Sequence, residues 1–113
     1  MKRRSGLVSN SSSTSFVINN NTGKNQALEV FTKEAIHLAD EYRKQYGYPG
    51  CREFTNEELI ASAAARGEVL APRFNIMTFG DEEGDLIGRV YDYILRDGGS
   101  TKNFSWSFYE FHR

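Results

Sequence analysis

One long amphipathic pattern constrains the fold of this chain more than any other feature. Between Asn25 and Tyr46, apolar residues recur three or four positions apart, which is the spacing that places side chains on one face of a helix. Asn25 has a side chain typical of a helix N-cap, and Gly47 and Pro49 are residues that end helices. The pattern therefore predicts one helix over residues 25–46, with an apolar face that another layer must cover. Its apolar members are Leu28, Phe31, Ala35, Ile36, Leu38, Ala39, Tyr42 and Tyr46.

Two shorter helices are predicted further along the chain. Thr55 and Glu58 have the spacing of a capping box, in which each side chain binds the backbone amide of the other residue. The alanine-rich stretch after them ends near Gly67, a residue that suits a left-handed helix end. Residues 86–95 again carry apolar side chains at helical spacing, and acidic residues precede them. We expect these two helices to pack with the longer one.

Three segments have the pattern of strands. Residues 15–19 contain a bulky and β-branched triplet before a run of turn-forming residues, and residues 73–79 and 103–111 alternate in the manner of a strand. In the last strand, we expect Phe104, Trp106 and Phe108 to face the helices. On the opposite, outward face of the sheet we expect Ser105, Ser107, Asn75, Met77, Phe79, Tyr109 and Phe111.

The order of these elements is β-α-α-β-α-β. We interpret it as an α+β fold in which a small three-stranded sheet is covered by helices on one face. If the last two strands are parallel neighbours, the connection between them is expected to be right-handed. The other face and one edge of the sheet would then stay open to a protein partner or to a second copy. With 113 residues the chain is long enough for one domain, which we place at residues 15–113.

Charge and composition disfavour several classes of function. The formal net charge of −1 supplies no field that would attract nucleic acid, and no run approaches the roughly 20 apolar residues of a membrane span. The short apolar stretch after the basic N-terminus does not fit an export signal. A lone cysteine, Cys51, excludes an internal disulfide and suits the cytoplasm or a particle assembled there.

No pattern of residues predicts catalysis, a metal or a cofactor. His37 and His112 lack a nucleophile or a second ligand nearby in the sequence, and Cys51 beside Arg52 reads as a loop residue. The acidic segment Asp81–Asp85 does not follow the spacing of a calcium loop, so we interpret it as capping the helix that follows. We therefore expect no enzyme, no metal site and no cofactor.

The first residues form a distinctive segment. Lys2, Arg3 and Arg4 precede six hydroxyl residues among the seven from Ser9 to Ser15. We interpret residues 1–14 as an arm that leads into the first strand. The segment Gly-Leu-Val-Ser-Asn-Ser-Ser-Ser-Thr-Ser-Phe, residues 6–16, resembles the N-terminal signature of short uncharacterised proteins of bacteriophages and bacteria. The resemblance implies a phage context, with the host cytoplasm or the phage particle as the location, and assigns no functional residue.

These observations favour a small phage-type accessory protein that acts by protein–protein contact, either on a host protein or as a minor component in assembly. The alternative is a protein that binds or sequesters a small anionic ligand or nucleotide with its basic, hydroxyl-rich arm, although this arm lacks the glycines and lysine of a phosphate-binding loop. The candidate binding residues are Lys2, Arg3, Arg4, Ser9, Asn10, Ser11, Tyr109 and Phe111, of which those in the arm would contact the anionic ligand of the alternative.

Overall fold

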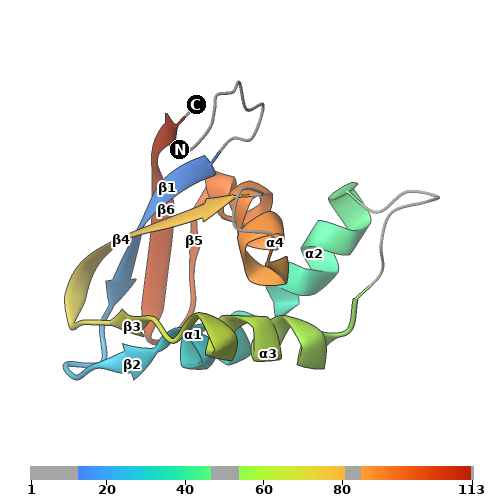
Figure 1. Cartoon of the computed structure of the whole chain (residues 1–113). Helices are drawn as coiled ribbons and strands as arrows, with labels where there is room; N and C mark the ends of the chain where they lie inside the picture. Colours follow the sequence, from blue (N-terminus) through green and yellow to red (C-terminus); the bar gives the residue numbers. More distant parts are fainter. Residues whose placement is uncertain (1–12, 47–53, 81–84, 113) are drawn as a thin grey trace.

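The computed structural model describes residues 13–46, 54–80 and 85–112, and these residues form an α+β fold (Figure 1). Four strands make one antiparallel sheet in the order β4-β1-β6-β5, and the helices lie on one side of it. The predicted fold class is confirmed, but the expected three strands and their order differ from what the structure shows. The strands are β1 (Ser13–Asn20), β4 (Arg73–Gly80), β5 (Gly99–Ser100) and β6 (Phe104–His112).

The last two long strands, β4 and β6, are not neighbours. Both pair antiparallel with β1, which lies between them in the sheet. A second, two-stranded sheet joins β2 (Gln26–Ala27) to β3 (Val69–Leu70) beneath the main sheet in the view of Figure 1. These two-residue strands are too short to leave a periodic signal in the sequence. The expected parallel pair is therefore replaced by a sheet built around the first strand.

The predicted helix over residues 25–46 is wrong as a single element. It is divided into α1 (Leu28–Glu34) and α2 (His37–Tyr46), and the backbone between them forms a tight turn at Ala35 with φ −100° and ψ 29°. The physical reason lies in packing, because α1 packs against α3 (Asn56–Arg66) while α2 packs against α4 (Leu86–Ile94). Because α3 and α4 lie in different places, α1 and α2 must run in different directions to pack against them.

The start of α1 also differs from the prediction. Asn25 is not the N-cap; Ala27 occupies that position, without a side-chain hydrogen bond. Residues 26 and 27 are instead held in the β2–β3 pair, and the amide of Leu28 donates to the carbonyl of Glu68 at 3.0 Å. The strand pairing satisfies backbone groups at this helix end that a polar side chain would otherwise cap.

The other helix signals are confirmed. The Glu58 amide donates to the Thr55 hydroxyl at 3.1 Å and the Thr55 amide donates to the Glu58 carboxylate at 2.8 Å, which completes the capping box. Gly67 ends α3 with a φ of 67°, and the Asp85 carboxylate accepts from the Gly88 amide at 3.1 Å to cap α4. These ends are fixed by residues close in sequence, which is why local patterns predicted them.

One face of the sheet is buried under the helices, and its composition corrects part of the prediction. Met77 and Phe79, which we expected to point outward, are 8% and 0% exposed, whereas Phe74 and Ile76 are 59% and 47% exposed on the outer face. Register explains the result, since paired residues share a face and Met77 pairs with the buried Phe16. Asn75, also expected to point outward, pairs with the buried Ile18 and lies on the same helix-covered face. The core residues on the sheet are Phe16, Ile18, Met77, Phe79, Phe104 and Trp106.

Phe31 of α1 lies at the centre of this core. Its ring meets those of Tyr91, Phe104 and Trp106 edge to face, with centroids 5.7, 5.2 and 5.4 Å away. Such contacts are favoured because the positive ring edge meets the negative ring face. The Tyr91 hydroxyl donates to the Thr32 hydroxyl at 3.1 Å, and burial raises the pKa of Tyr91. An aromatic cluster therefore joins helices α1 and α4 to strand β6.

Glu34, at the end of α1, fixes the turn between β5 and β6. Its carboxylate accepts from the amide and side-chain nitrogens of Asn103 at 2.9 and 2.8 Å and from the Thr101 hydroxyl. Burial alone would raise the pKa of Glu34, but these hydrogen bonds and the nearby Lys102 hold it below its ordinary value of 4.5. The ionised carboxylate is thus the form that stabilises the folded chain.

This cluster predicts a pH-dependent stability. Because the folded pKa of Glu34 is lowered, its contribution is present above pH 4.5 and is lost as the pH falls through the folded value. The Glu34→Gln variant should be about 1 kcal/mol less stable than wild type at neutral pH, and the difference should shrink under acid conditions. Urea unfolding of both proteins at a series of pH values measures this. A difference that stays constant with pH would contradict it.

Candidate interaction surface

The structure places only two of the eight candidate binding residues. Tyr109 and Phe111 belong to β6 and are 50% and 47% exposed. The remaining candidates lie outside the described residues, as do Cys51 and the first four residues of the acidic segment Asp81–Asp85. Of the predicted arm, residues 1–14, only Ser13 and Thr14 are described, and both belong to β1. The candidates outside the described part are Lys2, Arg3, Arg4, Ser9, Asn10 and Ser11.

A bulge brings two aromatic rings together at the end of β6. The register with β1 shifts there, so Phe108 pairs with Phe16 while Glu110 pairs with Ser15, and Tyr109 is the additional residue. Ideal alternation would place Phe108 and Phe111 on opposite faces of the sheet. The bulge puts both on the same face, where their ring centroids are 4.8 Å apart.

These rings are exposed even though they lie on the side of the sheet that the helices cover. Phe108 is 41% exposed, in contrast with Phe104 and Trp106, which are 1% and 4% exposed on the same strand. Phe108 thus lies on the predicted face, although the helices do not bury it, whereas the prediction that Phe111 lies on the outward face is wrong. We name Phe108, Tyr109 and Phe111 the aromatic end of β6.

Arg96 contacts one ring of the aromatic end of β6 and holds it in place. Its guanidinium lies over the ring of Phe111 at 4.9 Å and over that of Tyr93 at 4.7 Å. Arg96 Nε also donates to the backbone carbonyl of Asp92 at 2.7 Å, and its Nη2 donates to the Asp92 carboxylate at 3.2 Å. The cation–π contacts and the hydrogen bonds fix the guanidinium, and through it the position of Phe111.

Asp92 continues this network into the interior. Its side chain is fully buried on α4 and its Oδ1 accepts from the Thr14 hydroxyl of β1 at 2.6 Å. Its Oδ2 has no partner among the described residues. Asp92 and Arg96 were not among the predicted site residues. The available signal is a charged residue between two aromatic residues, Tyr91 and Tyr93, four positions before an arginine.

The aromatic end of β6 also has an open backbone edge. The short strand β5 pairs only with Ser105 and Trp106, so within the described part of the chain no strand pairs with the outer edge of β6 beyond Trp106. An open edge presents backbone donors and acceptors that another chain can pair with. Exposed rings and backbone groups therefore occur together at this end of the sheet.

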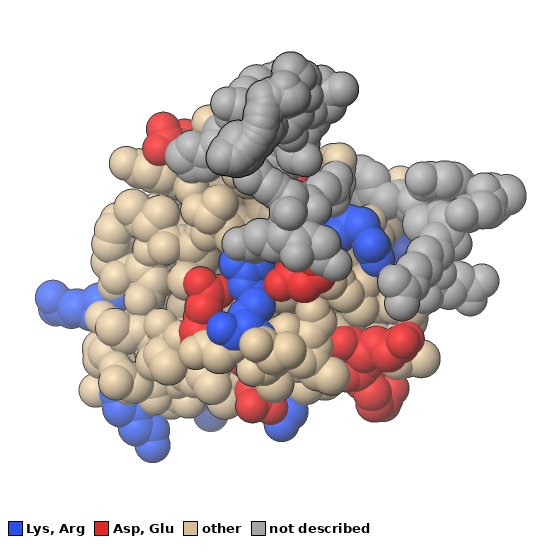
Figure 2. All heavy atoms as spheres, viewed as in Figure 1, with Lys and Arg blue, Asp and Glu red and all other residues tan. Residues whose placement is uncertain are grey.

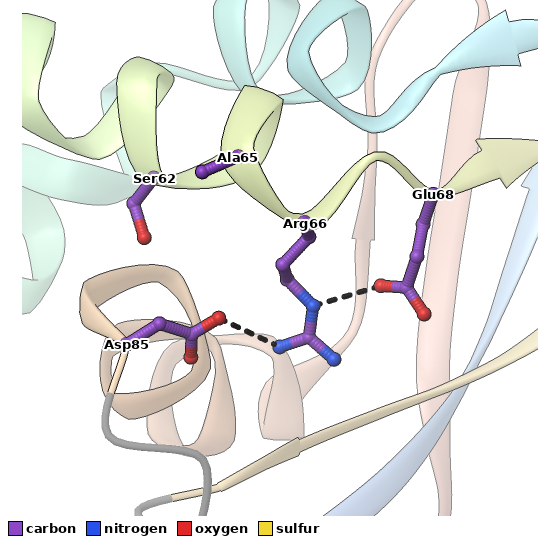
Figure 3. Close-up of a pocket in the computed structure, with 5 residues that line it drawn as sticks. All are labelled: Ser62, Ala65, Arg66, Glu68 and Asp85. Carbon is purple, nitrogen blue, oxygen red and sulfur yellow. Dashed lines mark hydrogen bonds and ion pairs between the residues drawn. The ribbon is translucent and has the colours of Figure 1, made fainter.

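A second feature is a pocket of about 420 Å³ between α3 and the start of α4, shown in Figure 3. Arg66 crosses it and donates to the carboxylates of Glu68 and Asp85, at 2.8 and 3.4 Å, and to the carbonyl of Thr78 at 2.9 Å. Its guanidinium also lies 4.8 Å from the centre of the Phe79 ring. Two carboxylates around one guanidinium do not favour an anion, so we interpret this cluster as joining α3, α4 and β4.

Charges on the molecule are mixed rather than grouped by sign. Figure 2 shows acidic and basic side chains interspersed over the helices, and an uncharged area over the strands on the left of the view. Within the three described segments no group of three or more His, Cys, Asp or Glu residues could hold a metal ion. No helix in the same segments has the length and apolar character to cross a membrane.

Comparisons of the chain with protein-family models, with curated proteins and with solved structures find no match.

Proposed function

We propose that this chain acts by protein–protein contact through the aromatic end of β6. The observation that carries the proposal is the group of three aromatic side chains, Phe108, Tyr109 and Phe111, each between 41% and 50% exposed within one strand. Their exposure costs hydrophobic stabilisation, which a partner would recover on binding.

The chemistry of this surface favours a protein as the partner. Tyr, Phe and Arg are enriched at the centres of protein interfaces, where a few rigid aromatic anchors supply most of the binding energy. Arg96 holds the Phe111 ring before any partner binds, so less conformational freedom is lost on binding. The edge of β6 beside these rings could also accept an extended segment of the partner.

For the biological role we propose a small phage-type accessory protein in the host cytoplasm or the phage particle. The signature-like N-terminal segment supports the phage context, and the two partners that fit are a host protein and a component of the phage assembly. The alternative, an anionic ligand bound by the arm, rests on Lys2, Arg3, Arg4, Ser9, Asn10 and Ser11.

The test is capture of a partner by the tagged chain from host lysate and from purified phage particles. We expect the double variant Phe108→Ser, Tyr109→Ser to recover at least tenfold less partner than wild type, because it removes two of the three anchors. The control Val30→Ser, Val69→Ser alters two apolar residues that are 38% and 56% exposed elsewhere on the chain. Unfolding midpoints of all three proteins establish that they are folded at the assay temperature.

The outcomes separate the roles. A host protein recovered at fixed stoichiometry supports the accessory role, and recovery of the chain only within particles supports the assembly role. Equal capture by the double variant and by wild type would contradict the proposed surface. Saturable thermal stabilisation by a nucleotide, lost when residues 1–13 are deleted, would favour the anionic-ligand alternative.

A further inference from the structure

The outer edge of β4 lacks the features that normally protect the edge of a sheet. Among the described strands β4 pairs only with β1, and from Phe74 to Gly80 it carries no charged residue, no proline and no register shift. Natural edge strands usually carry lysine, proline or a bulge that prevents pairing with another chain. Here two large apolar side chains, Phe74 and Ile76, are 59% and 47% exposed beside the unprotected edge.

Hydrogen bonds elsewhere in the sheet show which backbone groups face this edge. In an antiparallel strand, the N–H and C=O groups of one residue point to one side and those of the next residue to the other. The Thr78 carbonyl accepts from Arg66, which lies outside the β1–β4 pair, so the backbone groups of Phe74 and Ile76 also point away from β1. On the far side of the sheet, the Asn21 amide donates to the Asn103 carbonyl, which fits the same alternation.

Only part of this edge is open. Arg66 occupies the Thr78 carbonyl at 2.9 Å, whereas no described residue hydrogen-bonds to Phe74 or Ile76 from outside the β1–β4 pair. At the start of the strand, the Asn75 side chain accepts from the Ala71 amide and donates to the Ala71 carbonyl, both at 2.9 Å. These bonds fix how the chain enters β4. The open edge is thus short, and its position is well defined.

We infer that β4 pairs antiparallel with β4 of a second copy of this chain, about a two-fold axis at Asn75. In this register Phe74 lies opposite the partner subunit's Ile76, and the symmetry repeats the pair. Each pair exchanges backbone hydrogen bonds in both directions, and uses only the residues whose outward groups are open. The two four-stranded sheets then become one continuous sheet.

The side chains fit this occupant. A ring opposite a β-branched residue is a favourable cross-strand pair, and here such a pair occurs twice on the outer face of the joined sheet. Arg73 lies opposite the partner subunit's Met77 in this register, so the two Arg73 side chains do not meet. The rest of the strand, from Phe74 to Gly80, is uncharged, so this register brings no like charges together.

The small size of this contact predicts a weak dimer. Two pairs of half-exposed side chains and one short ladder bury less than the roughly 1,200 Å² at the lower limit of stable interfaces. Association is therefore expected in the range of about 10 µM to 1 mM. The contact lies across the sheet from the aromatic end of β6, because β1 separates β4 from β6. It goes beyond the proposed function, and either one can fail without the other.

Sedimentation equilibrium of the full chain over this concentration range tests the dimer. We expect wild type to associate, Ile76→Lys to stay monomeric because it places charge at the centre of the contact, and the control Val30→Lys to associate as wild type does. Val30 is 38% exposed on α1, away from the sheet edge. The milder variant Phe74→Ser should weaken association at least tenfold. It replaces Ile76→Lys as the test of the contact if Ile76→Lys does not fold.

Amide exchange of wild type provides a test that needs no variant. The amides of Phe74 and Ile76 should gain protection as the concentration rises, while those of Asn75 and Met77, which face β1, should not change. A chain that stays monomeric at about 1 mM would overturn the inference. So would a dimer that Ile76→Lys and Phe74→Ser leave intact, or one that is lost only when residues 1–12 are deleted.

Discussion

Replacing Phe31 with alanine should lower the free energy of unfolding by about 3–5 kcal/mol, the usual cost of removing a fully buried aromatic side chain. Phe31 is 0% exposed and contacts the rings of Tyr91, Phe104 and Trp106, so the loss creates a cavity between α1 and β6. Domains of this kind have total stabilities of about 5–15 kcal/mol. The variant is therefore expected to be marginally folded or unfolded at 37 °C. Thermal and urea unfolding, monitored by circular dichroism, compare its stability with that of wild type.

Two controls separate the cavity from other effects. Phe31→Leu keeps most of the side-chain volume but loses the ring contacts, and should cost about 1–2 kcal/mol. Val30→Ala changes the neighbouring residue, which is 38% exposed, and should stay within about 0.5 kcal/mol of wild type. A Phe31→Ala protein as stable as Val30→Ala would show that Phe31 is not at the centre of the core.

Replacing Asp92 with alanine should cost about 2–4 kcal/mol, because it leaves buried groups without partners. The Thr14 hydroxyl would lose its acceptor at 2.6 Å, and Arg96 would lose the carboxylate that holds its Nη2 at 3.2 Å. The cost is expected at the lower end of that range if water reaches Arg96, whose side chain is 32% exposed. Urea unfolding measures the effect.

A double-mutant cycle isolates the bond between Thr14 and Asp92. Thr14→Val keeps the shape of the side chain and removes its hydroxyl, and its combination with Asp92→Ala should be less costly than the sum of the two single changes by about 1–2 kcal/mol. Additive effects would show that the two groups do not interact. Because Arg96 also holds Phe111, Asp92→Ala should weaken capture of a partner through the aromatic end of β6 as well.

The sequence predicted best the elements whose ends are set by nearby residues. The start of α3 follows from the spacing of Thr55 and Glu58, and its end from Gly67, because each capping contact lies within one helical turn. β1 was predictable for a similar reason, since a bulky, β-branched triplet precedes turn-forming residues. These features depend little on the rest of the chain.

The division between α1 and α2 could not be predicted in this way. The apolar pattern continues through Ala35 and Ile36 without interruption, and neither residue breaks a helix. The direction of each helix is set by contacts with α3 and α4, which come later in the chain. A periodic pattern defines an apolar face but cannot show that two partners cover different parts of it.

The orientation of β4 shows a related limit. Phe74 and Ile76 alternate with Met77 and Phe79, so both faces of the strand are apolar and the pattern does not indicate which one meets the helices. The choice is made by pairing with β1, where Phe16 and Ile18 are buried. The surface that we assign to a second copy was hidden in the sequence for this reason.

The candidate surface was predictable only in part. Tyr109 and Phe111 were expected on the outward face of the sheet, and both are exposed. Phe111, however, pairs with the buried Thr14 and so lies on the face that the helices cover, whereas the prediction assumed that alternation continues past Phe108. The bulge at Tyr109 interrupts that alternation, and it arises from the pairing of β6 with β1. The candidates from Lys2 to Ser11 remain predictions.

The central position of β1 has a consequence for synthesis of the chain. Its contacts reach far along the sequence, with 63 residues separating Ser15 from Thr78 and 86 separating Asn19 from Ser105. During synthesis, β1 therefore leaves the ribosome well before β4 or β6 has been made. Until then the apolar residues of β1 have no strand to pair with. Folds dominated by such distant pairings form slowly, because the entropy of closing a long loop is lost before the contacts between its ends stabilise the chain. Expression of this protein should thus depend on how well chaperones shield the nascent first strand.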